Sequence, residues 1–261
     1  MTVIPVLAAA SLLRLAIYYG YPTLVEQSGG NVRDAARVLG AYDVLVLGDG
    51  LELPPDARAS GLDDERRKLP DLISLLHATR RRTEVFGYID LGRSQNLSLE
   101  EIARRIELWQ RVGADGIFFD EAGTDFGVSR DTRNDAIEAV HRRRLSVFLN
   151  VFDPDDAFNG AADAQPDAQL GAGDAVLLES FAVRNGVLEP REATATRVAA
   201  AQLHRRAGVR MLGVTTTLGE YDAALFAEAH SRAVELQLDG FGWGEPTFSA
   251  ADSRLPWRRE D

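Results

Sequence analysis

Several residue types on which common catalytic sites depend are absent or scarce in this sequence of 261 residues. It contains no cysteine, which excludes disulfides, thiolate metal sites and a cysteine nucleophile. Lys68 is the only lysine among 29 basic residues, so almost no candidate remains for a Schiff-base lysine. The four histidines, His77, His141, His204 and His230, all fall inside segments with helical spacing, which favours a role on helix faces.

Long hydrophobic runs and an excess of positive charge are also missing. No run approaches 18 uncharged apolar residues, which argues against a membrane partner. The formal net charge is −11, from 40 acidic and 29 basic residues, which argues against a nucleic-acid partner because phosphates need a basic surface. A hydrophobic fraction of 45% over this length is enough for one buried core.

We predict a single domain over residues 1–261, with a short segment at each end that lies outside the predicted strands and helices. The apolar start lacks a basic segment and is interrupted by Pro5, which favours an ordered lead-in over 1–14 to a cleaved signal. We therefore favour a cytoplasmic location, with secretion or the cell envelope as the alternative. Residues 246–261 are interpreted as a C-terminal tail.

Short apolar runs recur about every 30 residues, and most are separated by segments with 3.6-residue spacing. This alternation predicts strands at 15–20, 44–48, 85–91, 116–120, 147–151, 175–179, 211–215 and 240–244. Helices are predicted at 32–39, 66–80, 99–112, 130–143, 191–206 and 221–238. Eight nearly continuous apolar strands predict a (β/α)₈ TIM barrel. An open doubly wound sheet is disfavoured because no G-x-G-x-x-G fingerprint follows the first strand.

Two helix starts carry a capping signal. Ser98 and Glu101 have the spacing of a capping box, in which each side chain bonds the backbone N–H of the other. Ser129 is placed to cap the next helix. Gly113 follows the predicted end of the third helix, as expected for a glycine C-cap.

The carboxyl ends of the strands build the active site in a TIM barrel, so the residues at those positions carry the functional signal. They are acids, aromatics and neutral polar residues: Tyr18, Tyr19, Asp49, Asp90, Asp120, Glu121, Asn150, Glu179, Thr215, Trp243 and Glu245. Histidine and lysine are missing among them, which excludes a Ser-His-Asp relay, a histidine base and a lysine aldolase. What remains is carboxylate chemistry of the kind that glycosidases use.

Strand alternation predicts which of these side chains meet. If Asp120 points into the barrel, Phe118 also points inward, while Ile117 and Phe119 face the helices. Asn150 and Glu179 keep the same alternation on their own strands, so three neighbouring strands would bring these polar groups to one mouth. The aromatic side chains of Tyr18, Tyr19 and Trp243 could stack on sugar rings there or belong to the core.

Three segments resemble one known family. They are Phe-Gly-Tyr-Ile-Asp-Leu-Gly at 86–92, Ile-Glu-Leu-Trp-Gln at 106–110 and Gly-Ala-Asp-Gly-Ile-Phe-Phe-Asp-Glu at 113–121. This pattern resembles the spherulin-4-like proteins and the endo-α-1,4-polygalactosaminidase-type glycoside hydrolases. The resemblance implies a barrel glycosidase that cleaves α-1,4-linked, galactosamine-containing polysaccharide. It also implies an acidic pair after the fourth strand, here Asp120 and Glu121, and a glutamate on a later strand, here Glu179.

Our hypothesis is a glycoside hydrolase in which Asp120 and Glu179 form the working pair. We expect Glu179 to be the general acid and Asp120 the nucleophile or base, with the roles interchangeable at this stage, and Glu121 and Asn150 to position the substrate. The substrate is a polysaccharide or oligosaccharide that can carry positive charge, and no cofactor or metal is expected. The alternatives are a non-catalytic barrel that binds a glycan or a protein, and a divalent-metal isomerase or lyase. The oligomeric state stays open.

Overall fold

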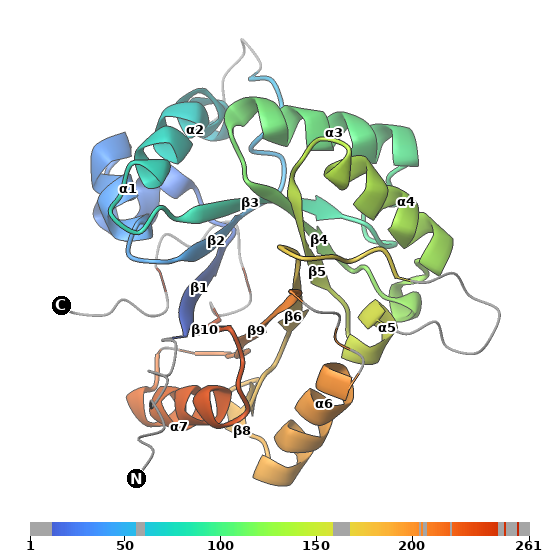
Figure 1. Ribbon diagram of the computed structural model, residues 1–261. Helices are drawn as coiled ribbons and strands as arrows, with labels where there is room; N and C mark the ends of the chain where they lie inside the picture. The colour runs from blue at the N-terminus through green and yellow to red at the C-terminus, as the bar shows by residue number, and fades with distance from the viewer. Residues whose placement is uncertain are drawn as a thin grey trace, which may run out of the picture.

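The computed structural model describes residues 12–55, 61–158, 168–203, 205, 208–219, 221–244, 248 and 255. Eight parallel strands close into a barrel in the order β1, β2, β3, β4, β5, β6, β9 and β10, and β10 pairs with β1 again. The predicted TIM barrel is therefore confirmed (Figure 1). The barrel strands are β1 (Leu13–Tyr18), β2 (Val44–Leu47), β3 (Glu84–Asp90), β4 (Gly116–Asp120), β5 (Ser146–Asn150), β6 (Ala175–Leu178), β9 (Arg210–Val214) and β10 (Gly240–Gly242).

Helices lie between the strands and cover the outside of the barrel (Figure 1). The α-helices are α1 (Val32–Leu39), α2 (Gly61–His77), α3 (Leu99–Val112), α4 (Arg130–His141), α5 (Pro154–Phe158), α6 (Arg191–Leu203) and α7 (Ala223–Glu235), and two 3₁₀ helices are η1 (Pro22–Gln27) and η2 (Thr124–Phe126). Helix α2 begins five residues earlier than its sequence pattern predicts, and α5, η1 and η2 were not predicted. In the described part of the chain, no helix combines the length and hydrophobicity needed to cross a membrane.

Two apolar layers result from the alternation of side chains along each strand. The inner layer fills the barrel and includes Phe86 and Phe148, whose rings meet edge to face with centroids 5.5 Å apart. Phe118 belongs to this inner layer, whereas Ile117 and Phe119 lie in the outer layer beneath the helices. The predicted alternation along β4 is therefore confirmed, and it directs the last residue of that strand toward the mouth.

The predicted helix caps are mostly confirmed. Ser98 accepts a hydrogen bond from the backbone N–H of Glu101 at 3.2 Å, and Gly113 ends α3 with a left-handed φ of 99°. Ser129 caps α4 through the N–H of Thr132. The second half of the capping box differs, because the Glu101 carboxylate accepts two hydrogen bonds from Arg104 one turn later, at 2.8 and 2.6 Å.

A small hairpin follows β6, where the sequence pattern predicted only a connection. Strands β7 (Val183–Arg184) and β8 (Val187–Leu188) are antiparallel and joined by Asn185 and Gly186, with φ values of 50° and 76°. Positive φ at both central residues is the geometry of a tight hairpin turn that asparagine and glycine favour. Backbone hydrogen bonds join the hairpin to Thr216, just beyond the end of β9: the N–H of Thr216 donates to Val183, and the N–H of Gly186 donates to Thr216. The hairpin therefore lies beside the carboxyl end of β9, at the mouth of the barrel.

Two described residues beyond β10 contact the first part of the chain. The ring of Phe248 lies 5.8 Å from that of Tyr19. The backbone N–H of Leu255 donates to Glu26 in η1 at 2.8 Å, and the side chain of Leu255 is buried. Phe248 and Leu255, both in the segment predicted to be a tail, therefore contact residues that follow β1.

Candidate active site

Three of the predicted site residues meet at the carboxyl end of the barrel. Asp120 ends β4, Asn150 ends β5, and Glu179 follows β6 directly, so the three lie on neighbouring strands. They line a small cavity of about 110 Å³. The remaining lining is mostly apolar and consists of Ile17, Tyr19, Phe118, Leu177, Val214 and Phe248.

The amide of Asn150 bridges the two carboxylates. Its Nδ2 atom donates to Asp120 Oδ1 at 2.8 Å and to Glu179 Oε2 at 3.0 Å. Because both oxygens bond the same nitrogen, they lie no more than 5.8 Å apart, the sum of the two bond lengths. Asn150 therefore fixes the spacing of Asp120 and Glu179 as well as their orientation.

Asp120 is held by three donors. Besides Asn150, the phenol of Tyr88 donates to Oδ2 at 3.1 Å and the backbone N–H of Glu121 donates to Oδ1 at 2.9 Å. Burial raises the pKa of Asp120, and these three hydrogen bonds oppose that rise because they stabilise the ionised form. The three donors favour the ionised form against the effect of burial, and the ionised form is the one that a nucleophile or base requires.

Glu179 has fewer donors and a different electrostatic setting. The surrounding protein displaces much of the hydration of its carboxylate and raises its pKa, although the side chain opens on solvent. The bond from Asn150 opposes this rise, the charge of Asp120 adds to it, and the charges of Arg184 and Arg197 lower the pKa. Because one donor stabilises the ionised form here, against three at Asp120, Glu179 is the better candidate to carry the proton.

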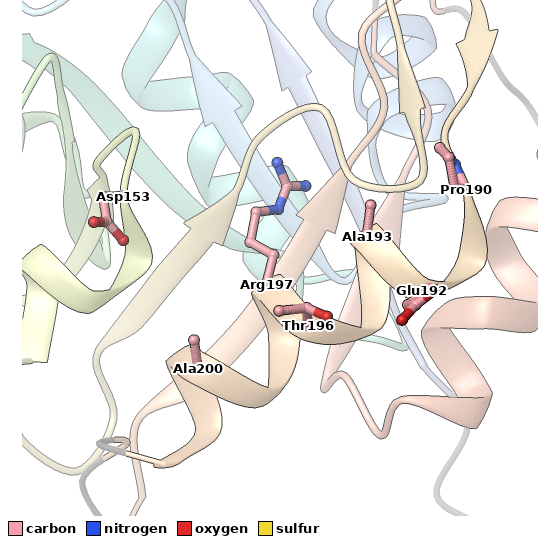
Figure 2. Close-up of a pocket in the computed structure, with 7 residues that line it drawn as sticks. All are labelled: Asp153, Pro190, Glu192, Ala193, Thr196, Arg197 and Ala200. Carbon is pink, nitrogen blue, oxygen red and sulfur yellow. The ribbon is translucent and has the colours of Figure 1, made fainter.

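Arg197, whose charge lowers the pKa of Glu179, also lines a larger cavity nearby. It extends from α6 and donates to the carbonyl oxygen of Ser180, the residue after Glu179, at 3.1 Å. The cavity has a volume of about 600 Å³ and lies between α6 and Asp153 (Figure 2). Its lining is Asp153, Pro190, Glu192, Ala193, Thr196, Arg197 and Ala200.

Asp90 is the most buried acid at this end of the barrel, with an exposed fraction of 1%. It pairs in register with Asp120 at the ends of β3 and β4. Burial, followed by the charges of Glu121 and Asp120, raises its pKa to about 6. Its side chain is not among those that line the cavity, and the predicted contact of Asp90 with substrate stays a prediction.

Glu121 follows Asp120 but turns away from the cavity. Its backbone has a left-handed φ of 50°, which directs the side chain toward the loop between β3 and α3. There the carboxylate accepts hydrogen bonds from the backbone N–H of Ser94, at 3.1 Å, and from the hydroxyl of Ser94. The side chain of Glu121 thus bonds a loop beside the mouth, and its expected role in catalysis or substrate positioning stays a prediction.

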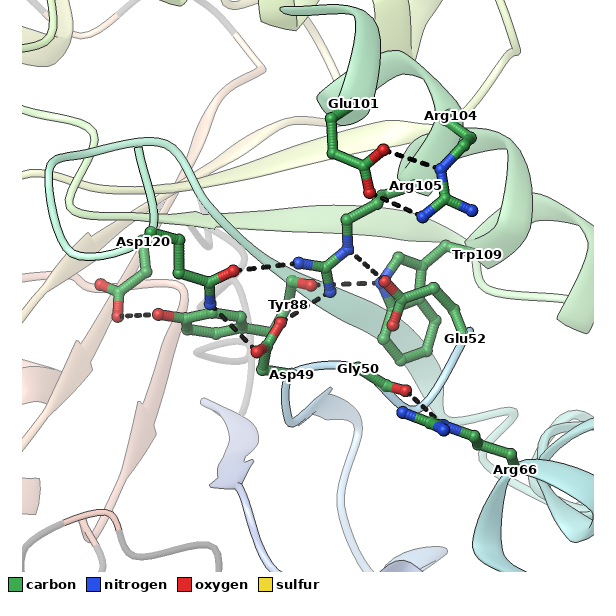
Figure 3. Close-up of polar contacts among 11 residues, drawn as sticks. Asp49, Gly50, Glu52, Arg66, Tyr88, Glu101, Arg104, Arg105, Trp109 and Asp120 are labelled. Atoms are coloured by element: carbon green, nitrogen blue, oxygen red, sulfur yellow. Dashed lines mark hydrogen bonds and ion pairs between the residues drawn. The ribbon is translucent and has the colours of Figure 1, made fainter. Parts of the chain in front are cut away.

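Asp49 belongs to an ion-pair network (Figure 3). Arg105 of α3 contacts Asp49 at 2.6 Å and also donates to Glu52, whose side chain is fully buried. Gln95 donates to Asp49 at 3.0 Å. Asp49 therefore ties loops to a helix and does not line the cavity. Arg105 lies three residues after Ile102 on the apolar face of α3, a signal that could have identified a buried ion pair.

The predicted aromatic and neutral polar contacts separate into two groups. Tyr19 lines the cavity and meets Tyr88 edge to face, with ring centroids 5.2 Å apart. Tyr18 is fully buried in the outer layer. Thr215 is buried and accepts a hydrogen bond from the backbone N–H of Gly244. Trp243 is buried against Tyr221 and Phe226. These three do not reach the cavity. Glu245 lies outside the described residues.

Phe248 is a lining residue that the sequence interpretation missed, because the segment 246–261 carries no strand or helix signal. Two of the described histidines lie away from the mouth: His77 bonds Asp115 at 2.8 Å and His141 bonds Asp174 at 2.9 Å. In the described ranges, no group of three or more acidic or histidine side chains is arranged to hold a metal ion.

Comparisons with known proteins bear on the fold. No protein-family model and no curated protein matches the chain. Among solved structures, the glycoside hydrolase domain of PelA from Pseudomonas aeruginosa is similar with a TM-score of 0.50 and 13% identity, covering 93% of this chain and 98% of that one. The carboxyl transferase domain of Rhizobium etli pyruvate carboxylase with pyruvate is similar with a TM-score of 0.53 and 11% identity, covering 92% and 40%. At such low identity these similarities establish the TIM-barrel fold of the chain.

Proposed function

We propose that this protein is a glycoside hydrolase that acts on α-1,4-linked, galactosamine-containing polysaccharide. The observation that carries the proposal is the pair of carboxylates, Asp120 and Glu179, whose oxygens bond the same Asn150 nitrogen at 2.8 and 3.0 Å and therefore lie no more than 5.8 Å apart. A spacing of about 5 to 5.5 Å is typical of glycosidases that retain the anomeric configuration. The similarity to the PelA glycoside hydrolase domain supports the proposal at the level of fold.

In the proposed reaction, Asp120 attacks the anomeric carbon while Glu179 gives its proton to the departing glycosidic oxygen. The bond from sugar to leaving group breaks as the bond from sugar to Asp120 forms. Glu179, now ionised, then takes a proton from a water molecule, whose oxygen displaces Asp120 from the sugar. Burial raises the pKa of both carboxylates, and the assignment rests on the three donors that favour the ionised form of Asp120, against one at Glu179.

The lining of the cavity supports an amino-sugar substrate. Its polar lining residues are Asp120, Asn150, Glu179 and the phenol of Tyr19, and it includes no arginine or lysine among the described residues. Carboxylates accept hydrogen bonds from sugar hydroxyls and attract an ammonium group. The cavity of about 110 Å³ is small, so further sugar units of a polymer would extend outside it, and the larger cavity beside α6 offers one path.

Hydrolysis of deacetylated and acetylated galactosaminan, followed by release of reducing ends, tests this proposal. We expect Asp120→Asn and Glu179→Gln to abolish release, and Asp125→Asn, which changes an exposed acid on the loop after β4, to retain it. NMR of the first product formed by the wild type should show the same anomer as the substrate. Binding without product would favour a glycan-binding module, and loss of activity with a chelator would favour the metal-dependent alternative.

A further inference from the structure

A cavity of about 560 Å³ lies at the end of the barrel opposite the candidate active site. It forms where the start of β1 meets the end of α1 and the turn after α2, and these two helices lie side by side (Figure 1). Because the strands are parallel, the first residues of β1 are at the far end from Asp120, which ends β4. Four arginines dominate its lining: Arg14, Arg37, Arg80 and Arg81.

The acidic side chains next to these arginines do not balance their charge. Asp43 contacts Arg14 at 3.5 Å and Arg81 at 3.4 Å, both long for ion pairs, while its Oδ2 accepts the backbone N–H of Arg14 at 2.8 Å. Arg37 pairs with Asp34 one turn away on α1, where both side chains are exposed. Arg80 has no acidic partner among the described residues. Four guanidinium groups thus face two carboxylates, in a chain whose net charge is −11.

The negative ends of two helices account for part of this cluster of positive charge. Arg37 lies in the last turn of α1, and Arg80 and Arg81 follow the end of α2, so each opposes the negative end of a helix. Interaction with a helix end does not require that the start of β1, the end of α1 and the turn after α2 line a common cavity. The turn after α2 nevertheless closes tightly on α1, since a Cβ placed on Gly40 would lie 2.8 Å from Thr79 Cγ2. The segments that carry these arginines are therefore in direct contact, and the side chains of Arg37, Arg80 and Arg81 line the cavity from exposed positions.

We propose that this cavity binds a small anion that carries two or more phosphate groups. Guanidinium groups form paired, charge-assisted hydrogen bonds with phosphate oxygens, and arginine is favoured over lysine for this contact. The volume falls within the range of small-molecule pockets and exceeds what one phosphate fills. This inference is independent of the proposed hydrolase activity, because it concerns the other end of the barrel.

Titration calorimetry of the full chain with inorganic triphosphate tests the site. We expect saturable binding of one triphosphate per chain with a Kd below about 1 mM, weakened by added salt. The double variant Arg80→Gln/Arg81→Gln should bind about a hundredfold more weakly, roughly tenfold for each guanidinium removed. The double variant Arg111→Gln/Arg142→Gln removes the same charge from exposed positions, one on α3 and one directly after α4, and should bind like the wild type.

Orthophosphate provides the second comparison. It reaches fewer guanidinium groups than triphosphate, so we expect it to bind at least about tenfold more weakly. The proposal is overturned if triphosphate does not saturate the protein, if both double variants weaken binding equally, or if orthophosphate binds as tightly. Melting temperatures of the variants show whether each is folded. A loss of stability in Arg80→Gln/Arg81→Gln without any binding by the wild type would leave only the helix-end role.

Discussion

Replacement of Asn150 by alanine is expected to move the whole pH profile of hydrolysis to higher pH. The wild-type amide donates to both Asp120 and Glu179 and stabilises the ionised form of each. A hydrogen bond to a charged group contributes about 1.5 to 3 kcal/mol. One pKa unit corresponds to about 1.4 kcal/mol, so the loss of each bond raises the pKa of its carboxylate by about 1 to 2 units.

The direction of the shift follows from the two roles. The acid limb of kcat/KM reports the carboxylate that must be ionised, and the basic limb reports the one that must be protonated. Both pKa values rise when the shared donor is lost, so both limbs move upward, whichever carboxylate has which role. Water that enters the space left by the amide would replace part of the bond, which makes a shift of about 1 unit the expected value.

The assay is release of reducing ends from deacetylated galactosaminan, measured as kcat/KM across the pH range. Gln110→Ala is the matched control, because it removes an exposed amide on α3, far from the mouth, and should leave both limbs in place. Limbs that stay in place in Asn150→Ala, or that move in opposite directions, would refute the assignment of Asn150 as the common donor. A lower maximal rate alone would not refute this assignment, because loss of the amide also disturbs the positions of the two carboxylates.

Three further predictions concern stability. Arg105→Met should lower the free energy of unfolding in urea by about 3 to 5 kcal/mol, because Glu52 is left buried without its partner, and adding Glu52→Gln should recover part of the loss. Gly87→Ala should lower it by about 1 to 3 kcal/mol or prevent folding, since the added Cβ would lie 2.0 Å from the indole of α3; unchanged urea midpoints would contradict this packing. The hydrogen bond to Asp174 raises the pKa of His141, so its contribution to stability is complete below the unfolded pKa of about 6.5 and is lost as pH rises through the folded pKa. Thermal melts of wild type and His141→Gln should therefore differ more at pH 6 than at pH 9, and an equal difference at both would argue against this linkage.

Strand alternation explains both the success and the errors of the sequence interpretation at the mouth. Asp120, Asn150 and Glu179 were correctly brought together because each keeps the inward alternation of its strand. The same rule already forbids Tyr18 and Tyr19 from lining the cavity together, since adjacent residues of a strand point to opposite faces. The structure assigns Tyr19 to the cavity and Tyr18 to the outer layer.

Residue patterns predict the strands well, but they indicate the backbone conformation of single residues and very short strands only weakly. The eight strands were predictable because each is a short apolar run flanked by turn residues or helices. The turn of Glu121 away from the cavity depends on a left-handed φ, which a glutamate seldom adopts and which its identity does not signal. The hairpin of β7 and β8 was a readable feature, because Asn185 and Gly186 form a favoured turn pair, but its strands have only two residues each.

Phe248 contributes to the cavity but not to the topology of the barrel. All eight strands of the barrel are complete at Gly242, so the topology needs nothing that follows. One wall of the cavity nevertheless comes from Phe248, against Tyr19 of the opening segment. A substitution at Phe248 would therefore reshape this wall of the cavity and leave unchanged the barrel that holds Asp120 and Glu179.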